Sequence, residues 1–205
     1  GRCMAAKVLG VRHVFVSPSV ERNEVERFRT AGVRVLNAID TARFVPVADA
    51  ETRKRIRERL GVGPDRIVVT SVGSCTDLKQ HDHVIEAVAL VLAEVPELHY
   101  VHVGDGPNRD TERTLCVSRG VEANCTFLGE RDDVVHILQA TDILVMPSRY
   151  EGLPIAAVEA SACGLPIIAY DAPGLRDAVV GEETGVLVAT EPAALAQAIL
   201  RLAAD

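Results

Sequence analysis

The sequence predicts an α/β protein built on a doubly wound parallel sheet, and two observations carry this prediction. From residue 67 onward, short runs of Val, Ile and Leu alternate with helical patterns through about six units. Strands written as unbroken apolar runs are buried on both faces, and helical connections make neighbouring strands parallel. Ligands of such sheets bind beyond the carboxyl ends of the strands. The loops after residues 72, 103, 128 and 147 should therefore share one crevice.

The alternation also predicts where each element lies. Strands are expected at residues 67–72, 98–103, 126–128, 143–146, 166–170 and 186–188. Helices are expected at 83–95, 108–119, 133–139 and 154–163, near Leu175, and from Pro192 onward. Pro96, Gly120 and Gly164 mark three helix ends, because proline cannot continue a helix and glycine adopts the left-handed conformation that often closes one.

The first part of the chain has a different pattern. A short strand at 14–16, a charged helix at 21–30 and a second strand at 33–36 precede the alternating units. We interpret residues 1–36 as the trailing edge of an amino-terminal domain or a linker, and residues 37–205 as the sheet domain. The basic stretch from Arg53 to Arg59 contains an acid, and we interpret it as a solvated helix face.

Composition restricts the class of protein. The 205 residues are 48% hydrophobic and 25% charged, a balance that supports a packed core. A net charge of -7 disfavours a nucleic-acid partner, which needs a basic face. The five cysteines form no C-x-x-C pair, so neither disulfides nor a zinc site are predicted. No apolar run reaches about 18 residues, so we expect no transmembrane segment and a cytoplasmic protein.

The most informative segment begins at Glu151, in the loop after a predicted buried strand. Pro154 suits the first turn of the following helix, because its missing N–H would have no partner there. The amides of Gly152 and Leu153 are then free to face the crevice. Together with the positive end of the helix dipole they form a site for an anion or a hydroxyl, with Glu151 as a hydrogen-bond acceptor beside them.

Glu159 lies two turns into the same helix, among alanines and Val158. An unpaired carboxylate buried there would cost several kcal/mol. It therefore either pairs with a backbone amide or a buried cation, or receives the two hydroxyls of a ribose. The spacing alone favours neither alternative.

The loop after strand 67–72 supplies Gly73, Ser74 and Lys79 before a helix. Lys79 is either a surface lysine near a helix start or the group that neutralises a phosphate, since the loop lacks a full P-loop pattern. His81 and His83 are two residues apart and diverge on a helix, so they do not indicate a metal. The glycines of Gly104-Asp105-Gly106-Pro107 and of Gly129-Glu130-Arg131-Asp132 mark tight turns after two further strands.

Taken together, these pieces resemble the carboxyl-terminal domain of glycosyltransferase family 4, whose members have two Rossmann-like lobes in the GT-B fold. The resemblance runs from about Asn37 to the end of the chain. It is carried, in order, by Asn37-Ala38-Ile39-Asp40, Phe44-Val45-Pro46, Val103-Gly104-Asp105-Gly106-Pro107, Phe127-Leu128-Gly129, Thr141-Asp142-Ile143-Leu144-Val145-Met146-Pro147-Ser148, the E-x7-E pair of Glu151 and Glu159, and Gly164-Leu165-Pro166-Ile167.

The resemblance implies a role for each of these residues. Lys79 and Glu151 would be catalytic, Lys79 on the diphosphate and Glu151 on the donor sugar. Glu159 would hold the ribose, and the loop from Phe127 to Arg131 would lie near the base. The full implied donor-binding set is Gly73, Ser74, Lys79, Gly104, Leu128, Gly129, Arg131, Glu151, Gly152, Leu153, Pro154 and Glu159. The family usually has an arginine where this chain has Ser74, so the positive charge at the diphosphate is reduced unless another cation substitutes.

The reaction that the resemblance implies is transfer of a sugar from a UDP-, GDP- or ADP-linked donor to an acceptor hydroxyl, with retention of anomeric configuration and without a bound metal. The acceptor would be a saccharide, a lipid or a small molecule held by an amino-terminal domain. We therefore expect the 205-residue chain alone to transfer no sugar.

Two alternatives remain at the level of sequence. One is a module that binds a nucleotide sugar without turnover. The other is a non-hydrolysing nucleotide-sugar epimerase, which would change the free donor sugar without an acceptor. A dehydrogenase is disfavoured because no G-x-G-x-x-G follows strand 67–72.

Overall fold

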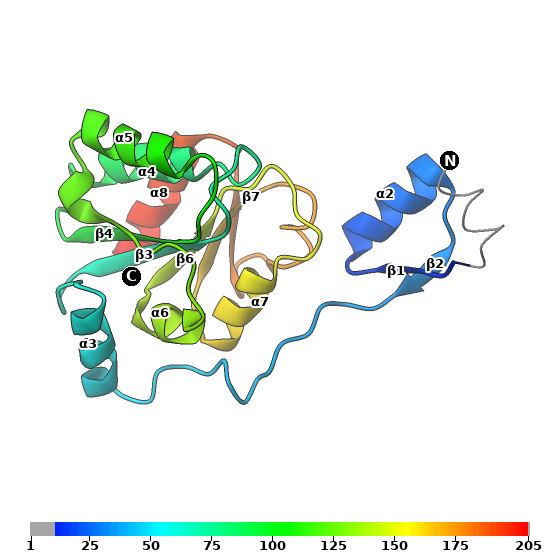
Figure 1. The fold of residues 1–205 in the computed structure, drawn as a ribbon, viewed down its shortest axis with the longest axis horizontal. Helices are drawn as coiled ribbons and strands as arrows, with labels where there is room; N and C mark the ends of the chain where they lie inside the picture. Colours follow the sequence, from blue (N-terminus) through cyan, green and yellow to red (C-terminus); the bar gives the residue numbers. More distant parts are fainter. Residues whose placement is uncertain (1–10, 205) are drawn as a thin grey trace.

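A computed structural model describes residues 11–204 and contains a six-stranded parallel sheet (Figure 1). Its strands lie in the order β5-β4-β3-β6-β7-β8. Their bounds are β3 (Ile67–Val72), β4 (Leu98–Val103), β5 (Cys125–Phe127), β6 (Ile143–Met146), β7 (Ile167–Tyr170) and β8 (Gly185–Val188). All neighbouring pairs are parallel. The prediction of a doubly wound sheet is confirmed.

Helices cover both faces of this sheet (Figure 1). Helices α4 (His81–Val91), α5 (Arg109–Arg119) and α8 (Pro192–Ala203) pack together on one face, where α4 contacts both of the others. Helices α3 (Ala50–Arg59), α6 (Val134–Ala140) and α7 (Ile155–Ala162) lie on the other face, and a 3-10 turn, η1 (Glu122–Asn124), precedes β5. No described helix is long and apolar enough to span a bilayer.

The strand predictions match the structure closely, because the central strands are buried along their whole length. Strands β3, β4 and β6 have the predicted bounds, and every residue of β4 and β6 is buried. The predicted helix near Leu175 is wrong. Gly174 has a φ of +81°, which breaks a helical path, and the segment folds as consecutive turns that bury Leu175.

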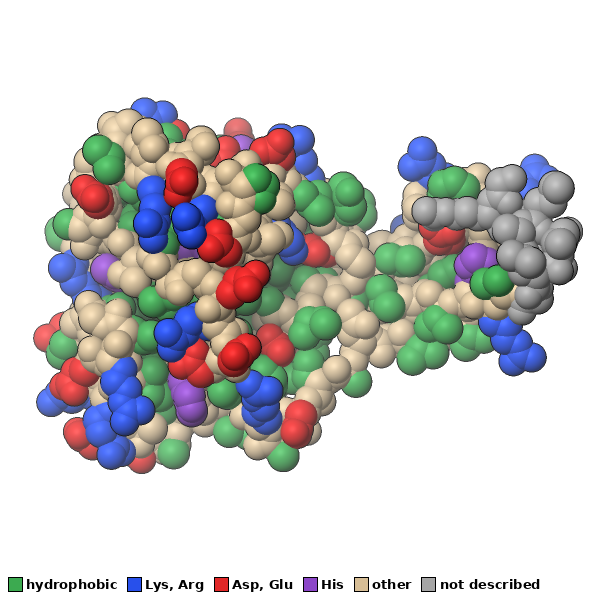
Figure 2. Space-filling view, in the orientation of Figure 1, with side chains coloured by type: hydrophobic (Ala, Val, Ile, Leu, Met, Phe, Trp, Pro, Cys, Tyr) green, Lys and Arg blue, Asp and Glu red, His purple; other side chains and the backbone are tan. Residues whose placement is uncertain are grey.

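The amino-terminal part is a small β-α-β unit made of β1 (His13–Phe15), α2 (Pro18–Phe28) and β2 (Gly32–Arg34). Its two parallel strands form a separate sheet, and an extended segment joins the unit to α3 (Figure 1). Apolar side chains lie on the surface of the unit and of the extended segment (Figure 2), and Val14 and Val33 are 60% and 65% exposed. Helix α2 contacts both strands, and the described part of the chain leaves Val14 and Val33 of this small sheet exposed.

The interpretation of the basic stretch as a solvated face is wrong for Arg57, and Arg53 is half-buried because it also donates to Asp142, at 2.6 Å. Arg57 is only 6% exposed, whereas Lys54, Arg55 and Arg59 are exposed as predicted. Arg57 Nη2 donates to Asp142 Oδ2 at 2.6 Å, and its other nitrogens donate to backbone carbonyls. Helix α3 is thus attached to the sheet by an ion pair whose guanidinium is buried and whose carboxylate is 29% exposed, and the alternation of charges in the sequence did not indicate this pair.

Candidate functional site

The candidate site lies where the strand order reverses. Along the chain, β3 leads outward to β4 and β5, and the next strand, β6, returns to the other side of β3. The loops after β3 and β6 consequently leave the sheet in different directions and open a crevice between them, which is the usual ligand position in doubly wound sheets. Lys79 follows β3 and Glu151 follows β6, so both predicted catalytic residues belong to this point of the sheet.

Lys79 and Glu151 are in direct contact. Lys79 Nζ donates to Glu151 Oε1 at 2.6 Å, and Ser148 Oγ donates to the same oxygen at 2.7 Å. The side chains of Lys79 and Glu151 are 20% and 12% exposed, so the pair is mostly withdrawn from solvent but still reachable. The structure thus joins two residues that lie 72 positions apart in the sequence.

Three glycine loops stack beside this pair at the carboxyl ends of β3, β4 and β5. The Gly73 amide donates to the Val103 carbonyl at 2.9 Å, and the Gly104 amide donates to the Gly129 carbonyl at 2.8 Å. Leu128, half-buried between them, donates its amide to the His102 carbonyl. A Cβ on Gly104 would lie 1.9 Å from the Gly73 carbonyl oxygen, so only glycine permits this approach. These loops form a small backbone surface close to Lys79, whose side chain lies along Gly73.

The loop from Glu151 to Pro154 is fixed by contacts with the segment around Pro173 and Gly174. The Glu151 amide donates to the Pro173 carbonyl at 2.9 Å, and a Cβ on Gly174 would lie 2.2 Å from the Glu151 carbonyl oxygen. The amides of Gly152 and Leu153 donate to no acceptor among the described residues. Pro154 directly precedes α7, whose first residue is Ile155. Two free amides therefore stand at the positive end of α7, as the sequence predicts.

Glu159 is half-buried on α7, and no described residue gives its carboxylate a hydrogen bond. Partial burial raises the pKa of Glu159 above its usual value, and the positive charge of Arg43 opposes this shift. Arg43 itself donates to the backbone carbonyl of Asp132, in the loop after β5. The described residues thus give Glu159 neither the backbone amide nor the buried cation that a structural role requires, because Arg43 is exposed.

Two further predicted residues lie at the margin of the site. Ser74 is exposed, and Arg131 is exposed and forms a bidentate pair with Asp133, with both N–O distances at 2.7 Å. A residue that sequence analysis missed lies closer to Glu151. Arg149 is exposed, its side chain has no partner among the described residues, and its amide donates to the carbonyl of Leu78, next to Lys79.

A cavity of about 820 Å³ opens in front of the Glu151 loop. One wall consists of Arg149, Tyr150, Glu151 and Gly152, and the opposite wall consists of residues of α2. The amide of Ser19, at the start of α2, donates to Asp177 Oδ2 at 2.7 Å and fixes the unit against the sheet domain. The free amides, the Lys79–Glu151 pair and this cavity are contiguous, which is the arrangement needed to hold an anionic ligand with hydroxyl groups.

Comparison with known proteins identifies the family. Residues 52–205 match the family model of the glycosyl transferases group 1. The chain belongs to the glycosyl transferases group 1 family.

Two curated relatives of this family illustrate the match. The chain is 32% identical over 163 residues to D-inositol 3-phosphate glycosyltransferase of Jonesia denitrificans, which covers 75% of the chain and 38% of the relative. It is 34% identical over 178 residues to the GDP-mannose-dependent alpha-(1-6)-phosphatidylinositol monomannoside mannosyltransferase of Mycolicibacterium smegmatis, which covers 82% of the chain and 46% of the relative. The chain therefore spans less than half the length of either relative.

A solved structure confirms the fold. Anabaena Alr3699/HepE in complex with UDP and glucose superposes with a TM-score of 0.83 over 94% of the chain and 53% of that protein, at 23% sequence identity. This likeness to a glycosyltransferase structure agrees with the predicted Rossmann-like lobe of a GT-B fold.

Proposed function

We propose that this chain is the donor-binding domain of a retaining family 4 glycosyltransferase, which transfers a sugar from a nucleoside diphosphate to an acceptor hydroxyl. The observation that supports it best is the Lys79–Glu151 contact at the reversal of strand order, beside the free amides of Gly152 and Leu153. A cation, a carboxylate acceptor and two backbone donors match a phosphate bonded to a sugar.

The chemistry follows from where charge develops. When the bond between the sugar and the diphosphate breaks, negative charge grows on the leaving diphosphate, and fixed donors aimed at that charge lower the barrier. In our proposal Lys79 and the two amides supply these donors. Glu151, held by Ser148, accepts hydrogen bonds from sugar hydroxyls. Arg149 supplies the second positive charge that Ser74 cannot provide.

The acceptor side is assigned to a further amino-terminal domain. This assignment is supported by the uncovered apolar side chains of the β1–β2 unit and by the greater length of the relatives. The names of the relatives and of the UDP complex favour a UDP- or GDP-linked donor and an acceptor that carries an inositol or a related polyol. One experiment tests both assignments. The chain is joined to an amino-terminal domain of this kind, and sugar transfer to an inositol-containing acceptor is assayed.

Replacing Lys79 by methionine should weaken UDP or GDP binding about 10- to 100-fold, because a charge-assisted contact to a phosphate contributes roughly 1.5–3 kcal/mol. Isothermal titration calorimetry measures the dissociation constants. Arg149→Met should show a smaller loss, since Arg149 is more exposed. Lys54→Met removes the same charge from the exposed face of α3 and should leave binding unchanged. Equal affinities for Lys79→Met and Lys54→Met would contradict the assignment of the diphosphate.

Replacing Glu159 by glutamine separates the two interpretations of that residue. The carboxylate has no described hydrogen-bond partner, so Glu159→Gln should leave the melting temperature of the ligand-free protein nearly unchanged. Saturating nucleotide at about 100 times its dissociation constant stabilises the wild type by roughly 2.7 kcal/mol, or about 5–10 °C. The variant should show a smaller shift, because it lacks a charged acceptor for the ribose hydroxyls. A large loss without ligand and an undiminished shift with ligand would identify Glu159 as structural.

A further inference from the structure

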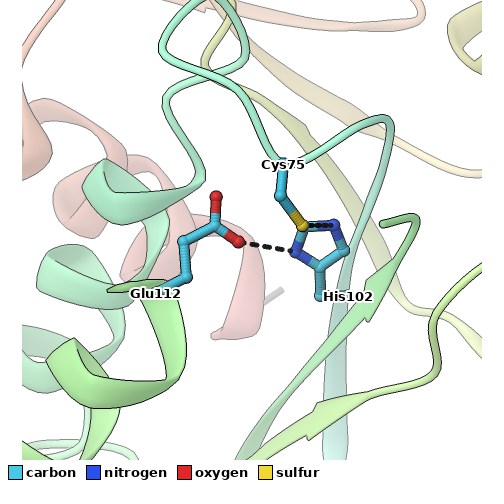
Figure 3. Close-up of side chains that lie close together, drawn as sticks. All are labelled: Cys75, His102 and Glu112. Atoms are coloured by element: carbon cyan, nitrogen blue, oxygen red, sulfur yellow. Dashed lines mark hydrogen bonds and ion pairs between the residues drawn. The ribbon is translucent and has the colours of Figure 1, made fainter. Parts of the chain in front are cut away.

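A second group of chemically active side chains lies outside the donor crevice, inside the domain. Cys75 comes from the β3–α4 loop, His102 from β4 and Glu112 from α5, and the three point toward one another (Figure 3). Their ligand atoms all lie within 4.8 Å of one another. All three residues are buried, and none is more than 3% exposed.

Two polar atoms of this group lack hydrogen-bond partners. His102 Nε2 lies 3.6 Å from Cys75 Sγ and 3.2 Å from the Gly73 carbonyl oxygen. On the other side of the ring, Glu112 Oε2 lies 3.5 Å from His102 Nδ1, which is long for a contact between nitrogen and oxygen. His102 Nδ1 and Glu112 Oε2 have no hydrogen-bond partner among the described residues. A buried carboxylate and a buried imidazole left in this state destabilise the fold.

A fourth polar side chain adjoins the group. The ring centroid of His81 lies 4.2 Å from that of His102, and His81 is 2% exposed. Neither of its ring nitrogens is in hydrogen-bond geometry with a described residue. Four buried groups that ordinarily require polar partners therefore meet at one place, and together they offer sulfur, nitrogen and oxygen donors.

We propose that Cys75, His102 and Glu112 bind a zinc ion, with His81 as the nearest further nitrogen donor. A thiolate, an imidazole and a carboxylate are the ligand types that zinc takes in proteins, and softer or harder metals favour all-sulfur or all-oxygen sets. In a tetrahedral zinc site the ligand atoms are about 3.5 Å apart. The three atoms would need to approach one another by only roughly 1 Å.

The site would act on the donor loop without touching the donor. Cys75 is two residues from Gly73 and four from Lys79, and its backbone is hydrogen-bonded to Asp105 and Asn108. Zinc would join the β3–α4 loop to β4 and α5 and fix the backbone that carries Lys79. The sequence predicted no zinc site because its cysteines form no C-x-x-C pair, and Cys75 and His102 are 27 residues apart.

The test measures metal content and stability of the whole 205-residue chain. Protein purified without chelator, or stripped and reloaded with zinc, should contain one zinc per chain by inductively coupled plasma mass spectrometry. Zinc at about 100 times its dissociation constant should raise the melting temperature of the stripped protein by roughly 5–10 °C. Cobalt should give a thiolate charge-transfer band.

Three variants decide the outcome. Cys75→Ala should abolish the cobalt band, and Cys163→Ala, which removes another buried thiol, should retain it. Glu112→Leu should abolish the zinc-dependent rise in melting temperature, yet in stripped protein it should melt close to the wild type, because it removes a buried carboxylate of which one oxygen has no hydrogen-bond partner among the described residues. The proposal is overturned if the wild type binds less than one zinc per two chains, or if the zinc-dependent rise persists in Glu112→Leu.

Discussion

Arg57→Ala is expected to lower the free energy of unfolding by roughly 3–5 kcal/mol, the largest loss that we predict for a side chain outside the site. The guanidinium is 6% exposed and donates to Asp142 at 2.6 Å. It also donates to the carbonyls of Pro64, Arg66 and Ala140. Its removal leaves the buried Ala140 carbonyl, two partly buried carbonyls and a partly buried carboxylate with fewer partners, and each such group carries a desolvation penalty.

Urea denaturation of the wild type and the variant measures this loss. Arg59→Ala is the matched control, because Arg59 lies on the same helix and is exposed, and substitutions of this kind change stability by about 0.5 kcal/mol or less. Equal midpoints for the two variants would show that α3 is not held to the sheet through Arg57.

The sheet was predictable from the sequence because its central strands are buried on both faces. A residue run such as Ile143 to Met146 has no polar position, and its short length and the proline that follows it favour a strand inside a covered sheet. Edges were predicted less well. Strand β5, at the margin of the sheet, begins one residue earlier than expected, and its residues are only half-buried.

Features that depend on distant contacts were not predictable. Arg57 is one of several arginines in a charged helix, and its burial is decided by Asp142, 85 residues later. The turns around Leu175 exist because Gly174 packs against the Glu151 backbone, a contact between two loops. The Cys75, His102 and Glu112 group arises in the same way, from a loop, a strand and a helix that the sheet order brings together.

The residues of the candidate site could be predicted from the sequence only in part. Glu151 and the two free amides could be predicted because a loop, a proline and a helix follow one another in the chain. Lys79 was ambiguous in sequence, and the sheet order resolves which side chain it meets, since β3 and β6 are neighbours. The donor contacts of all these residues, Ser74 and Arg131 included, stay predictions, and Arg149 was missed because no local pattern distinguishes it from a surface arginine.

Gly104→Ala is expected to destabilise the domain by more than about 3 kcal/mol and to weaken nucleotide binding. The φ of Gly104 is +141°, a conformation that costs a residue with a Cβ roughly 1–3 kcal/mol. The new Cβ would also lie 1.9 Å from the Gly73 carbonyl oxygen, and relieving such an overlap in packed structure costs a further 1–3 kcal/mol or so. Because the Gly73 carbonyl belongs to the backbone, the β3–α4 and β4–α5 loops must separate, which displaces the loop that carries both Gly73 and Lys79.

Alanine variants of two other glycines serve as controls, because they introduce the backbone strain without the atomic overlap. Gly120 and Gly129 have φ values of +70° and +68°, and a Cβ on either would meet no atom within 4 Å. Their alanine variants should therefore lose only about 1–2 kcal/mol, the usual cost of the left-handed conformation for a residue with a Cβ. Urea midpoints give the stabilities, and calorimetry with UDP or GDP gives the affinities. If Gly104→Ala were no less stable than Gly120→Ala, the close approach of the two loops would be wrong. If it were unstable yet bound nucleotide as the wild type does, the loops would not be part of the donor site.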